Sequence, residues 1–379
     1  MQLTEEQTII RDSVRDFVQN RIVPFAAEWD KADHFPAEQL KEMGELGLYG
    51  MIIPEEWGGS GLDYVSFALA LEEVAAGDGA CSTILSVNNS VVCGSLLKFG
   101  SDDIKEKYLK PLASGEKLGC FCLTEPQAGS DASALKTTAV KKGNEYILNG
   151  TKTFITSGKN AQVAIVFAVT DKEDGKKGIS AFVVPTDNPG YQVGTIENKM
   201  GQHASDTAQI FLKDCCIPED HLLGSEGEGY KIALMNLESG RIGIAAQSVG
   251  MARAAYEVAL EYARERETFG KHIIEHQAVG FRLADMATQL EAAHLMVLNA
   301  ARLRDANEPC LKQASMAKLF ASETAEKVCS AAIQTLGGYG YLKDYPLERI
   351  YRDVRISQIY EGTSDIQRIV IAREIANNR

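Results

Sequence analysis

A change of pattern near the middle of the chain most constrains its fold. Between about Cys120 and Gly229, short runs of β-branched and aromatic residues, such as Val163–Val169 and 179–184, are separated by Gly, Asn, Asp and Pro clusters. No helical stretch lies between these runs, which is typical of an antiparallel barrel or sandwich rather than of βαβ units. The sequence therefore predicts an α+β protein with a β region between two helical regions.

The flanking regions have helical periodicity. Before Gly119 the pattern is mainly helical, with breaks at Pro24, at Pro36 and in the turn-rich segment 54–61. After Gly229, apolar residues alternate steps of three and four, which predicts long helices packed as a bundle; these residues are Leu283, Met286, Leu290, Ala293, Val297 and Ala300. We place the domains at 1–118, 119–228 and 229–379.

Charge and composition exclude several classes of function. The chain has 379 residues and a net charge of -13, which disfavours nucleic acid or an anionic membrane as the main partner. No apolar run approaches the roughly 20 residues of a membrane helix, and the chain starts with a capping-box pattern at Thr4 to Gln7 instead of a leader. Its eight cysteines form no C-x-x-C pair, so we expect buried free thiols and a cytoplasmic protein.

The most informative candidate for chemistry is Glu361. It precedes Gly362, which can adopt a positive φ, and Thr363 or Ser364 can cap the helix predicted by Ile366, Ile369 and Val370. This arrangement can hold a carboxylate over a substrate. A single Glu before a helix is more often a solvated surface acid, so other segments have to support the assignment.

Three further segments have the composition of ligand-binding turns. Residues 123–131 supply two hydroxyls and several backbone N–H groups, residues 152–157 place an aromatic ring near a hydroxyl, and residues 334–340 end a predicted helix with a glycine nest. Each alone is equally typical of a turn, a core aromatic or a helix cap. Together with Glu361 they indicate one extended binding site.

Other motifs are absent or weak. No G-x-G-x-x-G follows a predicted strand and no P-loop occurs, so neither a Rossmann site nor a P-loop site is supported. His272 to His276 match the H-x-x-E-H pattern of inverted zinc proteases, but Gly270 and Gly280 bound the segment and no third ligand is evident. We therefore expect no metal site and interpret the segment as a surface helix turn.

At these residues the chain resembles the acyl-CoA dehydrogenase family over essentially its whole length. Residues 123–131 resemble its L-[TS]-E-P-x-x-G-S-D signature, 334–340 its Q-x-x-G-G-x-G, and 360–368 its Y-E-G-T-[SA]-x-I-Q-[RK]. The short-chain, butyryl-CoA type is the most similar. The resemblance implies a helical N-terminal domain, a β-barrel middle domain and a C-terminal four-helix bundle, in a homotetramer arranged as a dimer of dimers.

The resemblance also implies FAD as cofactor, an acyl-CoA substrate and an electron-transfer flavoprotein as redox partner. Thr124 and Thr156 would bind the flavin ring, Phe154 would pack beside it, and Ser130 would lie between FAD and the acyl-CoA. The resemblance further implies two sets of residues. The cofactor set adds Phe121, Leu123, Ile155, Thr363 and Asp365, with Arg266, Phe269, Gln277, Gln334, Gly337 and Gly338 reaching the FAD of a neighbouring subunit; the substrate set adds Glu238, Arg241, Tyr360 and Gly362.

Glu361 is the implied catalytic base. Relatives of the isovaleryl and long-chain types carry the base at the position of Gly240, whereas this chain has Gly there and Glu at 361. The implied reaction is removal of the α proton by Glu361 and transfer of the β hydrogen as hydride to flavin N5, which yields a trans-2-enoyl-CoA.

Four alternatives remain. They are preference for medium or branched acyl chains, an oxygen-using acyl-CoA or nitroalkane oxidase on the same fold, a non-enzymatic flavin- or CoA-binding scaffold, and a zinc hydrolase.

Overall fold

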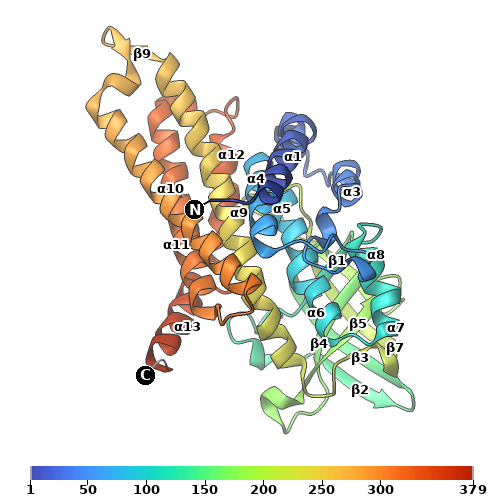
Figure 1. Cartoon of the computed structure of the whole chain (residues 1–379). Coiled ribbons are helices and arrows are strands. Elements are labelled where there is room, and N and C mark those ends of the chain that lie inside the picture. The colour runs from blue at the N-terminus through green and yellow to red at the C-terminus, as the bar shows by residue number, and fades with distance from the viewer. Residues whose placement is uncertain (1, 378–379) are drawn as a thin grey trace.

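The computed structural model describes residues 2–377 and has a helical N-terminal part, a β-sheet middle part and a helical C-terminal part (Figure 1). Helix α1 starts after Thr4, whose hydroxyl accepts a hydrogen bond from the Gln7 backbone N–H while the Gln7 side chain accepts one from the Thr4 N–H. The expected capping box is therefore present. The N-terminal helices are α1 (Glu5–Arg21), α2 (Val23–Ala32), α3 (Ala37–Glu45), α4 (Tyr64–Gly77), α5 (Gly79–Ser86), α6 (Gly94–Phe99), α7 (Asp102–Ile104) and α8 (Lys110–Ala113).

One helical stretch is longer and more apolar than expected, because no apolar run near the length of a membrane helix was predicted. Helix α5, the π-helical segment Val87–Cys93 and α6 form a stretch of 21 residues that is long and apolar enough, by length and composition, to cross a membrane. However, 89% of its most apolar window is buried inside the fold. Packing in the protein core therefore accounts for its composition.

The middle part is one eight-stranded sheet with strand order β6-β7-β3-β2-β4-β5-β8, in which β1 also pairs with β4. Most neighbours are antiparallel, as expected, but β1–β4 and β2–β4 are parallel. The strands are β1 (Gly119–Cys122), β2 (Thr138–Lys142), β3 (Glu145–Thr156), β4 (Val163–Val169), β5 (Ile179–Pro185), β6 (Tyr191–Ile196), β7 (Thr207–Pro218) and β8 (Leu222–Leu223).

Strands β4 and β5 are buried on both faces, which explains their continuous apolar sequences. Val166 and Phe182 pack with Leu148 and Ile210 of β3 and β7, so the sheet curves around a core of its own. The opposite face of β4, including Phe167, packs against the N-terminal helices. The sheet is thus fixed against the helices that precede it.

The C-terminal part is built from α9 (Gly229–Glu265), α10 (Gln277–Asp305), α11 (Leu311–Leu336), α12 (Leu347–Val354) and α13 (Ser364–Asn377). All six apolar residues that predicted α10 are buried. Helix α9 packs against both α11 and α4, and it extends from the sheet to the far end of the bundle (Figure 1). At that end a short hairpin, β9 (Glu267–Thr268) and β10 (Lys271–His272), connects α9 to α10.

All eight cysteines are free thiols, and seven are buried as expected. Cys216 is exposed, because it lies on β7 with its side chain pointing away from the core of the sheet.

Candidate active site

Glu361 lies in the turn that leads into α13. Its φ is +51° and that of Gly362 is +94°, so two consecutive residues are in the left-handed region. A positive φ is unfavourable for Glu but not for Gly. The Thr363 hydroxyl accepts a hydrogen bond from the Ile366 N–H at 3.3 Å and so caps α13, as the sequence indicates. The turn and the cap together direct Glu361 back toward the bundle.

The Glu361 carboxylate points at Gly240 on α9. A Cβ atom added at Gly240 would overlap Oε2 of Glu361, so the absence of a side chain at Gly240 makes room for the carboxylate. Both carboxylate oxygens are buried, and neither has a hydrogen-bond partner among residues 2–377. The residue as a whole is partly accessible, but the atoms that titrate are enclosed. Burial raises the pKa of Glu361 to about 7, against the opposing influence of Lys318 and Arg241.

Those two cations lie on the helices that flank the carboxylate. Lys318 on α11 is fully buried, and its ammonium donates a hydrogen bond to the Gly362 carbonyl oxygen at 2.7 Å. Arg241 on α9 is also buried, and its Nε has no partner among the described residues. Burial lowers the pKa of Lys318 to about 8, partly offset by Glu361. The predicted base therefore lies in an enclosed site with two positive charges nearby.

Tyr360, predicted to contact substrate, has its side chain in a polar network where the three parts of the chain meet. Its hydroxyl donates to Oε1 of Gln247 on α9 and lies 3.5 Å from the Thr83 hydroxyl of α5. Gln202, in the loop before β7, donates to the same hydroxyl at 3.4 Å. This network fixes the backbone immediately before Glu361.

A buried ion pair holds the segment that follows β1. Nζ of Lys152 on β3 lies 2.7 Å from Oε1 of Glu125, and both side chains are almost fully buried. The Glu125 carboxylate also accepts backbone hydrogen bonds from Lys136 and Thr137. Burial alone would raise the pKa of Glu125, but Lys152 and these hydrogen bonds outweigh it and lower the pKa to about 2.

This ion pair brings the first group of predicted cofactor residues together. Lys152 also donates to the Leu123 carbonyl oxygen at 3.3 Å, and the Thr153 N–H donates to that of Thr124 at 3.0 Å. The end of β1 therefore lies beside the end of β3, where Phe154 and Thr156 are found. The structure thus places Thr124, Phe154 and Thr156 in one region, far along the chain from Glu361.

Phe154 has an unusual conformation. It lies at a register shift between β3 and β7, its φ is +58°, and its side chain is 64% exposed. A bulge of this kind redirects a side chain out of the sheet. The bulge thus leaves a large aromatic ring available to stack against a planar ligand.

The remaining residues of this group differ in exposure. Ile155 points into the core of the sheet, Phe121 is half-buried with its ring centroid 4.8 Å from that of Phe167, and Ser130 is exposed.

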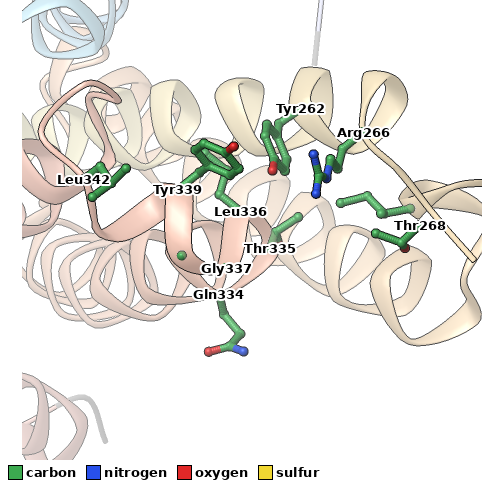
Figure 2. Close-up of a pocket in the computed structure, with 11 residues that line it drawn as sticks. Tyr262, Arg266, Thr268, Gln334, Thr335, Leu336, Gly337, Tyr339 and Leu342 are labelled. Carbon is green, nitrogen blue, oxygen red and sulfur yellow. The ribbon is translucent and has the colours of Figure 1, made fainter.

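The second group of predicted cofactor residues lies at the far end of the bundle. Arg266, Gln334, Gly337 and Gly338 line a pocket of about 500 Å³. Figure 2 shows Arg266 with Tyr262 and Tyr339 on one side of this pocket, whereas the Gln334 side chain extends away from them. The Arg266 guanidinium lies 5.8 Å from the centre of the Tyr339 ring. Within one chain, this end of the bundle, with β9, lies away from β1 and β3, which lead to Thr124 and Thr156 (Figure 1).

The glycine nest in this pocket is open. Gly337 has a φ of +61°, and a Cβ added at Gly337 or Gly338 would meet nothing within 4 Å. Phe269, at the tip of the β9–β10 hairpin, has a φ of +52° and is 97% exposed. Gln277 is exposed at the start of α10. These residues form a surface that a single chain leaves uncovered.

Two other predicted residues are already engaged within the chain. The Glu238 carboxylate accepts a hydrogen bond from the Cys310 thiol at 3.3 Å and lies 3.5 Å from Arg304. Asp365 is exposed in the first turn of α13, 3.8 Å from Arg368. A ligand that contacts Glu238 would therefore have to share its carboxylate with Cys310 and Arg304.

The H-x-x-E-H segment does not form a zinc-binding helix. His272 belongs to β10 and His276 follows the three-residue 3-10 helix Ile273–Glu275, because Gly270 turns the chain into a hairpin before any α-helix starts. His276 instead lies 3.2 Å from the Thr268 hydroxyl. Within residues 2–377 no group of three or more His, Cys, Asp or Glu side chains is arranged to hold a metal ion.

Lys318 is not among the residues predicted from the sequence, although the sequence contains a signal for it. Lys318 is the one charged residue on a face otherwise formed by Ala314, Ala317, Ala321 and Ala325, all of which are buried. A lysine in an apolar stripe at helical spacing predicts a buried charge that needs a partner.

Comparison with known proteins shows one family along the whole chain. The N-terminal, middle and C-terminal domains of acyl-CoA dehydrogenase match residues 4–116, 120–215 and 227–376. The mitochondrial short-chain specific acyl-CoA dehydrogenase of Homo sapiens is 49% identical over 372 residues, which is 98% of this chain and 90% of the human protein.

Solved structures agree with this match. Butyryl-CoA dehydrogenase from Megasphaera elsdenii superimposes with a TM-score of 0.98 at 41% identity, covering 100% of both chains. A chain solved in a study of the electron transferring flavoprotein of Acidaminococcus fermentans has the same TM-score at 47% identity, again covering 100% of both. A glutaryl-CoA dehydrogenase from Mycobacterium smegmatis solved with FADH2 is 33% identical, with a TM-score of 0.94 and coverage of 98% and 96%.

The predicted fold class, with its helical, β-sheet and helical domains, is confirmed by these matches. The chain therefore belongs to the acyl-CoA dehydrogenase family and is an oxidoreductase that acts on acyl-CoA thioesters.

Proposed function

We propose that this enzyme oxidises a short-chain acyl-CoA of about the size of butyryl-CoA to the trans-2-enoyl-CoA, with FAD as hydride acceptor and Glu361 as base. The observation that carries the proposal is the buried Glu361 carboxylate, which has no hydrogen-bond partner among the described residues and faces Gly240. A general base works best when its pKa lies near the working pH, and the pKa of Glu361 is raised to about 7.

The residues present fit FAD. The exposed Phe154 ring on its strained backbone suits one face of a flavin, and Thr124 and Thr156 lie beside it. The open Gly337 and Gly338, with Arg266 nearby, suit a pyrophosphate group, because free backbone N–H groups and a guanidinium both bind such oxygens. When bound, FAD supplies the hydride acceptor that no side chain provides.

The distance between these two groups of residues supports a shared cofactor site. Arg266 and Phe269 adjoin β9, which lies at the end of the bundle away from the sheet (Figure 1), so one chain does not bring them to an FAD held at the ends of its own β1 and β3. We therefore propose that Arg266, Phe269, Gln277, Gln334, Gly337 and Gly338 bind the FAD of a neighbouring subunit in a homotetramer.

In the reaction Glu361 removes the α proton of the substrate through one of its two unpartnered carboxylate oxygens. The proton becomes acidic only if donors stabilise the thioester oxygen as negative charge develops. The Glu361 backbone N–H is the proposed protein donor, and the positive φ of Glu361 orients it differently from a helical N–H. The acyl chain excludes water from the site, which keeps the carboxylate reactive.

Preference for short chains rests on the relatives. The human protein is named for short-chain specificity, and the Megasphaera elsdenii structure is a butyryl-CoA dehydrogenase. Electron transfer to an electron-transfer flavoprotein is proposed from the Acidaminococcus fermentans study. Asn88 and Asn89, in the π-helical segment Val87–Cys93, donate hydrogen bonds to the backbone carbonyl oxygens of Tyr49 and Leu48, so they act through the packing of the N-terminal helices.

The test is the visible absorption spectrum of the purified protein during anaerobic addition of butyryl-, isobutyryl- and octanoyl-CoA. The proposal predicts a flavin band that bleaches fastest with butyryl-CoA. A flavin band that bleaches fastest with octanoyl-CoA contradicts the chain-length preference. Absence of flavin after incubation with FAD contradicts the proposed cofactor.

A further inference from the structure

Lys318 has no role in the reaction described so far, yet it lies beside the predicted base. Its side chain is fully buried on α11, where lysines are rarely found without a partner. Its ammonium donates to the Gly362 carbonyl oxygen at 2.7 Å, and Glu361 is the carboxylate whose charge acts on it most strongly. Burial of this charge is costly, so its retention at this position needs an explanation.

The backbone contact alone does not explain the lysine. The Gly362 carbonyl oxygen also accepts a hydrogen bond from Nε2 of Gln367 at 2.9 Å. A neutral side chain at position 318 would therefore leave that oxygen satisfied. The charge of Lys318 is the property that nothing else on α11 supplies at this site.

Glu361 has the complementary requirement. Its carboxylate is enclosed, and neither oxygen has a hydrogen-bond donor among residues 2–377. Positive charge acting through space favours ionisation of a buried carboxylate of this kind. A direct hydrogen bond would stabilise the ion too, but it would occupy an oxygen that has to accept the α proton.

We propose that Lys318 is a positioning residue for Glu361: it holds the Glu361–Gly362 turn through the Gly362 carbonyl and keeps the carboxylate ionised through space, while leaving both carboxylate oxygens free. The inference rests on the proposed function of Glu361 as base. It adds that the charge on α11 sets the pH at which the enzyme works.

Other charged groups surround this pair and define its electrostatics. Arg241 on α9 also favours the ionised form of Glu361. The remaining charged groups that act on Lys318, on Arg241 or on Tyr360, the residue preceding the base, are Glu238, Glu323, Asp353 and Arg373. These groups are unchanged in every variant below, so a difference between variants reports on position 318.

Three substitutions separate the two parts of the proposed role. Lys318→Met keeps the volume and removes charge and donor, Lys318→Gln keeps a shorter donor without charge, and Lys318→Arg keeps the charge. Lys312→Met, at the start of the same helix, is the matched control. Since the Glu361 carboxyl can take up a proton when the charge at position 318 is removed, no uncompensated charge remains buried, and Lys318→Met is expected to fold and bind FAD.

The first readout is the rate of anaerobic flavin reduction by butyryl-CoA as a function of pH. Removing the positive charge raises the pKa of Glu361, so the pH at which the rate rises moves upward, by about one to three units, the range usual for loss of a neighbouring opposite charge. We expect this shift in Lys318→Met and Lys318→Gln, and little shift in Lys318→Arg and Lys312→Met.

The second readout does not depend on turnover. Infrared difference spectra of the protein, titrated with and without Glu361→Gln to assign the band, report protonation of the Glu361 carboxyl group directly. The same upward shift is expected in Lys318→Met.

The outcomes distinguish this inference from the proposed function. A Glu361→Gln variant that reduces flavin at the wild-type rate overturns the proposed base, and the inference with it. An inactive Glu361→Gln together with an unshifted pH profile and infrared titration in Lys318→Met overturns the inference alone. A purely structural role would lower the melting temperature and the rate at all pH values without moving either titration.

Discussion

The Glu361 carboxylate occupies the space that a side chain at Gly240 would fill. Two segments far apart in the chain, the middle of α9 and the turn before α13, thereby meet at the predicted base. The family resemblance gives two positions for the base, 240 and 361, and these positions are thus neighbours in space. A carboxylate at either position, 240 on α9 or 361 before α13, can therefore reach the same region of the site.

Replacement of Gly240 by Ala should displace Glu361 without unfolding the protein, because the overlapping atom is at the end of a flexible side chain. A misplacement of about 1 Å can cost roughly 10²-fold in rate, so we expect a loss of that size in anaerobic flavin reduction. Stopped-flow absorbance measures it, with the melting temperature as a check of folding.

Gly280→Ala is the matched control for a glycine replaced within a helix, since its added Cβ would meet only the Ile274 carbonyl oxygen at an ordinary 3.5 Å. A wild-type rate in Gly240→Ala would show that the carboxylate is not confined as described.

The activity should depend on pH through Glu361. Because a base has to be ionised, kcat/KM for butyryl-CoA should rise with pH through about 7, the value to which burial raises the pKa of Glu361 in the free enzyme. A profile whose acidic limb lies near the ordinary pKa of a glutamate would contradict the enclosed site.

The same raised pKa predicts an effect on stability. A carboxyl group with a higher pKa in the folded state contributes stability that is complete below its unfolded pKa of 4.5 and is lost as the pH rises through about 7. Glu361→Gln should therefore raise the melting temperature relative to wild type at pH 8 and have little effect at pH 4. Equal gains at both pH values would argue against burial of the charge.

The Lys152–Glu125 ion pair should be important for stability. Removing one partner of a buried pair leaves an uncompensated charge, so Lys152→Met should lower the free energy of unfolding by about 3–5 kcal/mol, measured by denaturant titration. The exposed pair of Lys141 and Glu219 is the control, and Lys141→Met should cost less than about 1 kcal/mol. Similar losses in the two variants would contradict the special role of the buried pair.

This pair also has a defined pH dependence. Because the pKa of Glu125 is lowered to about 2, its contribution to stability is complete above 4.5 and is lost as the pH falls toward 2. The stability difference between wild type and Lys152→Met should shrink over that range.

Sequence periodicity was sufficient for elements whose structure is local. The Thr4 capping box, the Thr363 cap and the positive φ of Gly362 depend on residues within one turn of each other, and the buried stripe of α10 depends on a regular repeat of apolar residues. Features that join distant segments were not predicted. The parallel pairing of β1 with β4, the burial of Lys318 and the meeting of Gly240 with Glu361 depend on tertiary packing, to which local patterns are insensitive.

Arg266 should contribute to cofactor retention. Arg266→Ala removes the guanidinium from the pocket that contains Gly337 and Gly338, so the purified variant should lose FAD faster on dialysis, measured as the ratio of flavin to protein absorbance. Arg264→Ala, an exposed arginine two residues earlier on α9, is the control. Full flavin content in Arg266→Ala after dialysis would exclude this role.

The central claim is that Glu361 removes the α proton, and Glu361→Gln tests it most directly. The variant keeps the volume of the side chain and removes the charge. We predict that it binds FAD but reduces it with butyryl-CoA at least about 10²-fold to 10⁴-fold more slowly than wild type, the range typical of a positioned base. Bleaching of the flavin band at the wild-type rate in Glu361→Gln would contradict the account.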